Sequence, residues 1–104
     1  MSESRLELLR QMAAEEPEDP FGAYALGLEL FKLERLEEGL AVLRALQQRH
    51  PNYVAVYYQL GRSLWQQDQP EQALHIIDLG IRQARDHGDS LALTELGELR
   101  ELIG

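Results

Sequence analysis

A segment of the chain recurs at a spacing of 34 residues, and this period restricts the folds that the chain can adopt. Corresponding positions of the two copies hold the same residue types: Tyr24, Leu26-Gly27, Leu30, Glu37 and Leu40 recur as Tyr58, Leu60-Gly61, Leu64, Glu71 and Leu74. A fixed period of this length is typical of stacked units that bury their apolar faces against their neighbours. It does not favour one closed core.

The hydrophobic residues follow helical periodicity throughout, and no alternating strand pattern occurs. Ser4 followed by Glu7 predicts a capping box at the start of the first helix. Pro17 and Pro20 end that helix, since proline cannot continue a helix interior. The expected core stripe of this helix consists of Leu6, Leu9, Met12 and Ala13.

Five further helices are predicted along the remainder of the chain. Asp19-Pro20 is a typical helix start, and Gly88 followed by Asp89 supplies a stop and then a new cap. The turns between the helices are short, so neighbouring helices should be antiparallel. The predicted helices cover approximately residues 21–33, 36–49, 53–67 and 70–85, and a last one runs from about 89 to near the end.

Three glycines fall at one repeat position inside predicted helices. A glycine there costs about 1 kcal/mol relative to alanine, so Gly27, Gly61 and Gly97 need a packing reason. Close approach of the paired helix supplies that reason. We expect Gly27 to face Gly39, and Gly61 to face Ala73.

The chain resembles the tetratricopeptide repeat family, which alternates two antiparallel helices every 34 residues. The resemblance covers residues 20 to about 100. The first copy matches through Ala23-x-x-Leu26-Gly27-x-x-Leu30, Gly39-x-x-x-Leu43 and Pro51. The second matches through Tyr57-x-x-Leu60-Gly61-x-x-Leu64 and Ala73-x-x-x-Ile77, and a partial third begins at Leu93-x-x-Leu96-Gly97.

This resemblance implies an all-α fold, a right-handed superhelix of antiparallel helix pairs with about six helices. We expect one domain over residues 1–104. Its parts are a leading helix (1–16), a first repeat (20–53), a second repeat (54–88) and a C-terminal capping helix (89–104).

The resemblance also implies a concave groove lined by the first helix of each pair, in which a peptide or helix of a partner lies. Phe31 and Trp65 match one another at the repeat spacing, and nothing in the sequence is expected to cover either. An aromatic stripe also suits a core, and the leading helix could hide Phe21 or Tyr24. The predicted groove residues are Phe21, Tyr24, Leu28, Phe31, Lys32, Tyr58, Arg62, Trp65 and Gln66; Ala55, Leu91, Thr94 and Glu98 share the same face.

Two bases lie beside these aromatic residues. Lys32 and Arg62 either grip a carboxylate of the partner or pair with nearby acids such as Glu29. Some members of the family bind acidic chaperone tails through a clamp of basic and asparagine residues. This sequence has other residues at the clamp positions, which disfavours such a ligand: Tyr24, Leu28, Thr94 and Glu98.

The formal net charge is −8, with six acids and two bases in residues 1–19 and four acids and one base in residues 89–104. An acidic chain repels phosphate backbones and anionic lipid, so we expect neither nucleic acid nor membrane as partner. The first fifteen residues lack the apolar run of an export signal, and there is no cysteine. We therefore expect a cytoplasmic protein.

The sequence contains no recognisable catalytic or cofactor-binding motif. Glu71, His75 and Asp78 share one helical face, but a single imidazole is a weak basis for a metal site. Ser63 has no base at a recognisable spacing. We predict no enzyme and no cofactor, and a protein-interaction scaffold instead. The alternatives are a self-associating, homodimeric repeat protein and a small regulatory subunit of an enzyme complex.

Overall fold

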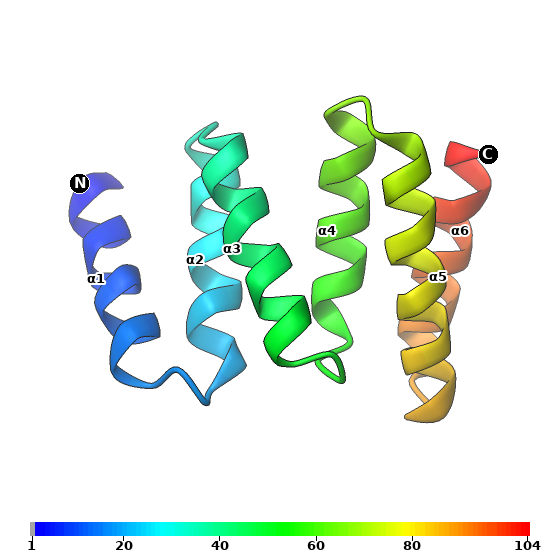
Figure 1. The fold of residues 1–104 in the computed structure, drawn as a ribbon, viewed down its shortest axis with the longest axis horizontal. Helices are drawn as coiled ribbons and strands as arrows, with labels where there is room; N and C mark the ends of the chain where they lie inside the picture. Colours follow the sequence, from blue (N-terminus) through cyan, green and yellow to red (C-terminus); the bar gives the residue numbers. More distant parts are fainter. Residues whose placement is uncertain (1) are drawn as a thin grey trace. The chain divides into compact units, whose positions relative to one another are not determined.

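The computed structural model describes residues 2–104, and side chains from Ser4 onward. These residues form six α-helices and no strand, which confirms the all-α prediction (Figure 1). The helices are α1 (Ser2–Glu15), α2 (Pro20–Lys32), α3 (Leu36–Arg49), α4 (Ala55–Gln66), α5 (Pro70–Asp86) and α6 (Ser90–Ile103).

Local capping residues fix several of the helix starts. The Asp19 carboxylate accepts a hydrogen bond from the Phe21 backbone N–H at 3.0 Å, and Pro20 is the first residue of α2. Asp89 caps α6 in the same way through the Ala92 N–H. The capping box expected at Ser4 is wrong, because α1 already begins at Ser2 and Ser4 lies inside its first turn.

The chain separates into two compact units, one up to His50 and one from Pro51 onward. The first unit holds α1, α2 and α3, and successive helices within it are antiparallel (Figure 1). Helix α2 contacts both of its neighbours. One hydrophobic cluster of the first unit consists of Leu6, Leu9, Leu26 and Leu30, with Ala13, Ala25, Leu33 and Val42 packed against it.

An ion pair joins the first two helices beside this core. The Arg5 Nε lies 3.1 Å from the Glu29 Oε1, and the Glu29 side chain is almost fully buried. A buried carboxylate needs such a partner, because an unpaired charge there would be strongly destabilising. The sequence analysis places Met12 in the core stripe of α1, but its side chain is 41% exposed. The stripe that packs inward therefore consists of Leu6, Leu9 and Ala13.

In the second unit, α4, α5 and α6 contact one another pairwise. Tyr57 is the largest side chain that is fully buried, and its hydroxyl donates to the Pro51 carbonyl oxygen. This hydrogen bond compensates for the loss of water around the buried hydroxyl. Ser63, also buried, accepts a hydrogen bond from the Gln67 amide at 2.9 Å.

The same turn ends α2, α4 and α5. Glu34, Asp68 and Gly88 adopt positive φ values of 61°, 61° and 66°. In each turn the next residue donates its N–H back across the last helical turn, as Arg35 does to the Leu30 carbonyl at 2.8 Å. This pattern is the Schellman motif, and glycine is the residue that adopts its left-handed position without strain.

The close-approach prediction is confirmed for two of the three glycines. A Cβ on Gly27 would lie 2.5 Å from a Leu43 methyl, and one on Gly61 would lie 2.7 Å from the Ile77 Cγ1. The paired residues face one another as expected. A Cβ on Gly39 would lie 3.3 Å from the Gly27 carbonyl oxygen, and a Cβ on Gly61 would lie 3.7 Å from the Ala73 carbonyl oxygen. The prediction is wrong for Gly97, whose Cβ position has open space around it.

Gly80 is a further glycine at a close approach, and the sequence did not single it out. A Cβ there would overlap the Tyr57 Cβ and lie 2.8 Å from its Cγ. These atoms are fixed by the α4 backbone, so they cannot move aside as a flexible side-chain end would. The absence of a side chain at Gly80 therefore sets the distance between α4 and α5.

Gly80→Ala should lower the free energy of unfolding by about 1–3 kcal/mol, because overpacking against Tyr57 outweighs the gain in helix propensity. Gly97→Ala is the matched control, and it should raise stability by up to about 1 kcal/mol since its Cβ enters open space. Urea unfolding followed by circular dichroism measures both. Equal stability of the two variants would contradict the packing around Gly80.

Candidate functional site

Helix α4 has one face in the core and another outside it. The buried face consists of Val56, Tyr57, Leu60, Gly61, Ser63 and Leu64. On the other face, Trp65 is 36% exposed, Arg62 and Gln66 are exposed, and Tyr58 is half-buried. None of these four side chains belongs to the buried face of α4. Their exposed parts are accessible to a binding partner.

A hollow of about 620 Å³ lies beside Tyr58, between α4 and α6. We call it the α4–α6 hollow. Leu99 is almost fully buried and forms its floor, whereas Leu102 is 70% exposed at its rim. The lining residues are Tyr58, Glu95, Glu98, Leu99, Glu101 and Leu102.

The lining of this hollow contains three carboxylates and no base. Arg100, the basic residue of α6, is bound elsewhere: its Nε donates to the Asp78 Oδ1 of α5 at 2.7 Å, and its terminal nitrogen reaches Oδ2 at 3.4 Å. The Arg100 guanidinium lowers the pKa of the Asp78 carboxyl below its ordinary value, mainly through this hydrogen bond. The charge of Arg100 is thus directed toward α5.

The groove residues predicted on α2 differ in their exposure. Phe21 is 57% exposed, so α1 does not cover it, and Lys32 is exposed as well. Tyr24 and Leu28 are half-buried. These residues lie in the first unit, whereas Tyr58, Arg62, Trp65 and Gln66 lie in the second.

Phe31 and Trp65 occupy equivalent repeat positions but have different surroundings. The Phe31 ring lies against Gly39 of α3, with ring atoms 2.6 Å from the place of a Cβ. The equivalent residue of the second repeat is Ala73, which carries a methyl group where Gly39 has none. The expectation that nothing covers either aromatic residue is therefore wrong for Phe31, which is half-buried.

The bases predicted beside the groove do not neutralise Glu29. That carboxylate pairs with Arg5. Lys32 and Arg62 form no ion pair within the part of the chain that the structure describes. Both bases stay exposed on their helices.

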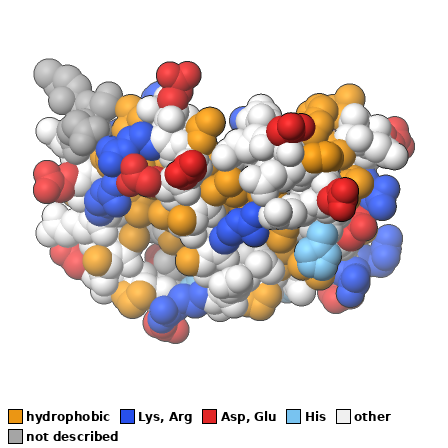
Figure 2. Space-filling model, turned by 45° about the horizontal axis from the view of Figure 1, so that its top comes forward, with side chains coloured by type: hydrophobic (Ala, Val, Ile, Leu, Met, Phe, Trp, Pro, Cys, Tyr) orange, Lys and Arg blue, Asp and Glu red, His pale blue; other side chains and the backbone are white. Residues whose placement is uncertain are grey.

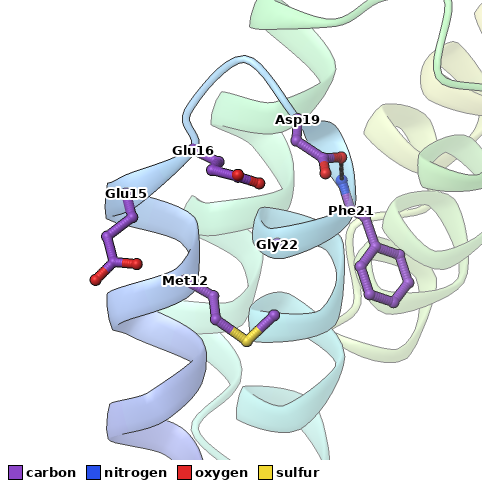
Figure 3. Close-up of a pocket in the computed structure, with 6 residues that line it drawn as sticks. All are labelled: Met12, Glu15, Glu16, Asp19, Phe21 and Gly22. Carbon is purple, nitrogen blue, oxygen red and sulfur yellow. Dashed lines mark hydrogen bonds between the residues drawn. The ribbon is translucent and has the colours of Figure 1, made fainter.

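A second hollow, of about 250 Å³, lies where α1 meets α2 (Figure 3). Its lining is Met12, Glu15, Glu16, Asp19, Phe21 and Gly22. Figure 3 shows Met12 directed toward α2, whereas the Phe21 ring points away from α1. Sequence reasoning missed this hollow because it assigned Met12 to the core.

Charged and hydrophobic side chains lie interspersed on the face drawn in Figure 2. Across residues 4–104, no three His, Cys, Asp or Glu side chains come together as a metal site would require. Asp78, one of the weak metal-ligand candidates, is bound by Arg100. None of the helices formed by the described residues has the length and hydrophobicity of a bilayer-spanning segment.

The arrangement of helix pairs, with small residues between them and one face of α4 outside the core, agrees with the family match. The model of the tetratricopeptide repeat matches residues 30–96. The chain belongs to the tetratricopeptide repeat family. This membership confirms the resemblance found in the sequence, and repeats of this family generally serve as protein-interaction modules without enzymatic activity.

Solved structures of tetratricopeptide repeats are similar to the chain. The crystal structure of a tetratricopeptide repeat domain protein from Salinibacter ruber is 33% identical, with a TM-score of 0.79, over 82% of this chain and 96% of that one. The TPR2B domain of yeast Sti1, in a complex with pHsp70, shares the fold at 19% identity and a TM-score of 0.87, over 94% and 78%. A protein from Bordetella parapertussis shares it at 24% identity and 0.79, over 94% and 85%. No curated protein has significant similarity to the chain.

The pair of Asp78 and Arg100 should make stability depend on pH. A carboxyl whose pKa is lowered in the folded state stabilises the fold above its ordinary pKa, and this contribution disappears as the pH falls through the folded pKa. Asp78→Asn should therefore cost up to about 1 kcal/mol near pH 6, the size of an exposed pair. The difference from the wild type should shrink below about pH 4.

Urea unfolding at several pH values measures this difference. Asp86→Asn is a control on the same helix, since Asp86 is exposed near its end. A difference between wild type and Asp78→Asn that stays constant down to about pH 3 would exclude this ion pair as its cause.

Proposed function

We propose that the protein is a scaffold that holds a peptide or helix of another protein against the outer face of α4. On this helix the binding residues are Tyr58, Arg62, Trp65 and Gln66. From α2 the proposal adds the predicted groove residues Phe21, Tyr24, Leu28, Phe31 and Lys32. Membership of the family supports protein binding as the class of function. The side chains of α4 indicate the binding surface.

The exposure of Trp65 is the observation that carries this proposal. Trp65 is the only tryptophan of the chain, and it is 36% exposed on a helix whose opposite face is buried. Tryptophan, tyrosine and arginine dominate the binding energy of protein interfaces. All three types occur within two turns of α4, at Trp65, Tyr58 and Arg62.

The complex with pHsp70 belongs to the yeast domain, and it does not supply the ligand of this chain. The sequence has Tyr24, Leu28, Thr94 and Glu98 at the positions where the chaperone-tail clamp would need basic or asparagine residues. A partner that binds through an acidic tail would therefore meet Glu98 and its acidic neighbours. We propose a different partner class, acting in the cytoplasm.

Self-association is a second candidate function. Leu91 and Leu102 of α6 are 69% and 70% exposed, and exposed leucines on a terminal helix can form a dimer interface. Light scattering at dilute and concentrated protein distinguishes this candidate. A mass that does not change with concentration and equals one chain would exclude stable self-association.

The double variant Tyr58→Ala, Trp65→Ala should abolish capture of the partner from the native cytoplasm. Its circular dichroism spectrum should match the wild type, and its melting temperature should fall only slightly, since neither side chain is part of the buried face of α4. In the wild type, the captured partner should protect Trp65 from quenching by acrylamide.

The control for this experiment is Leu8→Ala, because Leu8 is equally an exposed hydrophobic residue but lies on α1. This variant should capture the partner as the wild type does. Loss of folding in the double variant would place Tyr58 and Trp65 in the core. Undiminished capture by a folded double variant would show that α4 is not the binding surface.

A further inference from the structure

We infer that the α4–α6 hollow binds a basic segment of the partner, in which lysines or arginines lie between apolar anchor residues. This inference rests on the proposed function and names the chemistry of the partner. It concerns only residues of the second unit.

The shape of the hollow suits apolar anchors. Its volume of about 620 Å³ lies within the range of roughly 300–1,000 Å³ typical of ligand pockets. Leu99 forms an apolar floor, Tyr58 lines it from α4, and Leu102 extends its rim. A leucine or aromatic side chain of a partner that packs on these three residues would bury apolar surface on both sides.

The charge of the hollow selects basic residues. Glu95, Glu98 and Glu101 line it, and none of them forms an ion pair with a described residue. Elsewhere the chain neutralises acids with arginines, as in the pairs Arg5–Glu29, Arg49–Glu18, Arg10–Glu38 and Arg100–Asp78. Three like charges beside an apolar surface raise the local concentration of cations and favour a cationic partner.

The apolar residues and the carboxylates lie in a regular order along α6. Leu91, Glu95, Glu98 and Leu102 follow one another at steps of four, three and four residues, which places them on one helical face. An apolar residue therefore lies at each end of the stripe, and carboxylates lie between them. A complementary helix carries bases in its middle and apolar residues one to two turns away on either side.

Charge disfavours a second copy of this chain as the occupant of the hollow. The chain has a formal net charge of −8, and its last helix holds three acids against one base. Two copies that met through their α6 helices would place like charges opposite one another, which costs binding energy. The same repulsion disfavours nucleic acid and anionic lipid.

The test uses a fluorescein-labelled helical peptide of about 16 residues, long enough to form a helix. The peptide has three lysines at its centre and leucines one helical turn away on either side. A second peptide has glutamates in place of the lysines, and a third has serines in place of the leucines. Fluorescence anisotropy should show binding of the first peptide only, and binding should weaken as salt is raised from about 50 to 500 mM.

The triple variant Glu95→Gln, Glu98→Gln, Glu101→Gln should bind the basic peptide about tenfold more weakly, since three rim charge pairs are lost. The matched control Glu7→Gln, Glu37→Gln, Glu71→Gln removes the same charge from exposed positions outside the hollow, and it should bind as the wild type does. Leu102→Ser should also weaken binding without changing the salt dependence. Circular dichroism verifies that all variants are folded.

Two binding results would overturn the inference: equal binding of the acidic and basic peptides, or an equal loss of affinity in the control variant. A dimer seen by light scattering that Leu102→Ser dissociates would also overturn it. The two proposals fail separately. If the wild type captures a native partner in a Trp65-dependent manner but does not bind the basic peptide, the proposed function stands and the basic partner is excluded.

Discussion

The distance between paired helices depends on residues that have no side chain. At Gly27, Gly61 and Gly80 a Cβ would overlap atoms of the opposite helix, namely those of Leu43, Ile77 and Tyr57. Each glycine costs helix propensity, and the packing of a large side chain against bare backbone offsets that cost. Because the helices meet at these points, the rotation of α4 is fixed. The same contact that buries Tyr57 turns the neighbouring Tyr58 outward.

Ion pairs between helices determine which carboxylates stay without a basic partner. Arg5 binds Glu29 between α1 and α2, and Arg100 binds Asp78 between α6 and α5. The exposed pair of Arg100 and Asp78 contributes little to stability by itself, whereas the pair of Arg5 and Glu29 compensates a buried carboxylate. Their effect on function is larger, because each occupied arginine leaves other acids without a partner. On α6 the remaining carboxylates are those that line the α4–α6 hollow.

Much of the fold was predictable because its determinants are local or repeated. Asp19 with Pro20, and Gly88 with Asp89, fix helix ends through hydrogen bonds and dihedral angles of neighbouring residues. The repeat spacing indicated the close approach at Gly27 and Gly61, since each has a partner helix at the same offset. The errors at Gly97 and Met12 have one cause. A pattern indicates that a residue could be covered, but it does not tell whether a helix is present to cover it.

The sequence by itself determined the six helices, their pairing and the family of the chain, because a 34-residue period and short turns allow few other arrangements. Only the tertiary structure decided which outward side chains are covered. Phe31 lies on Gly39 while Trp65 stays exposed, although the two are equivalent in the repeat. Likewise, only the folded second unit brings Tyr58 beside α6. These outcomes depend on the volume and charge of residues that are distant in the sequence, and no local pattern contains that information.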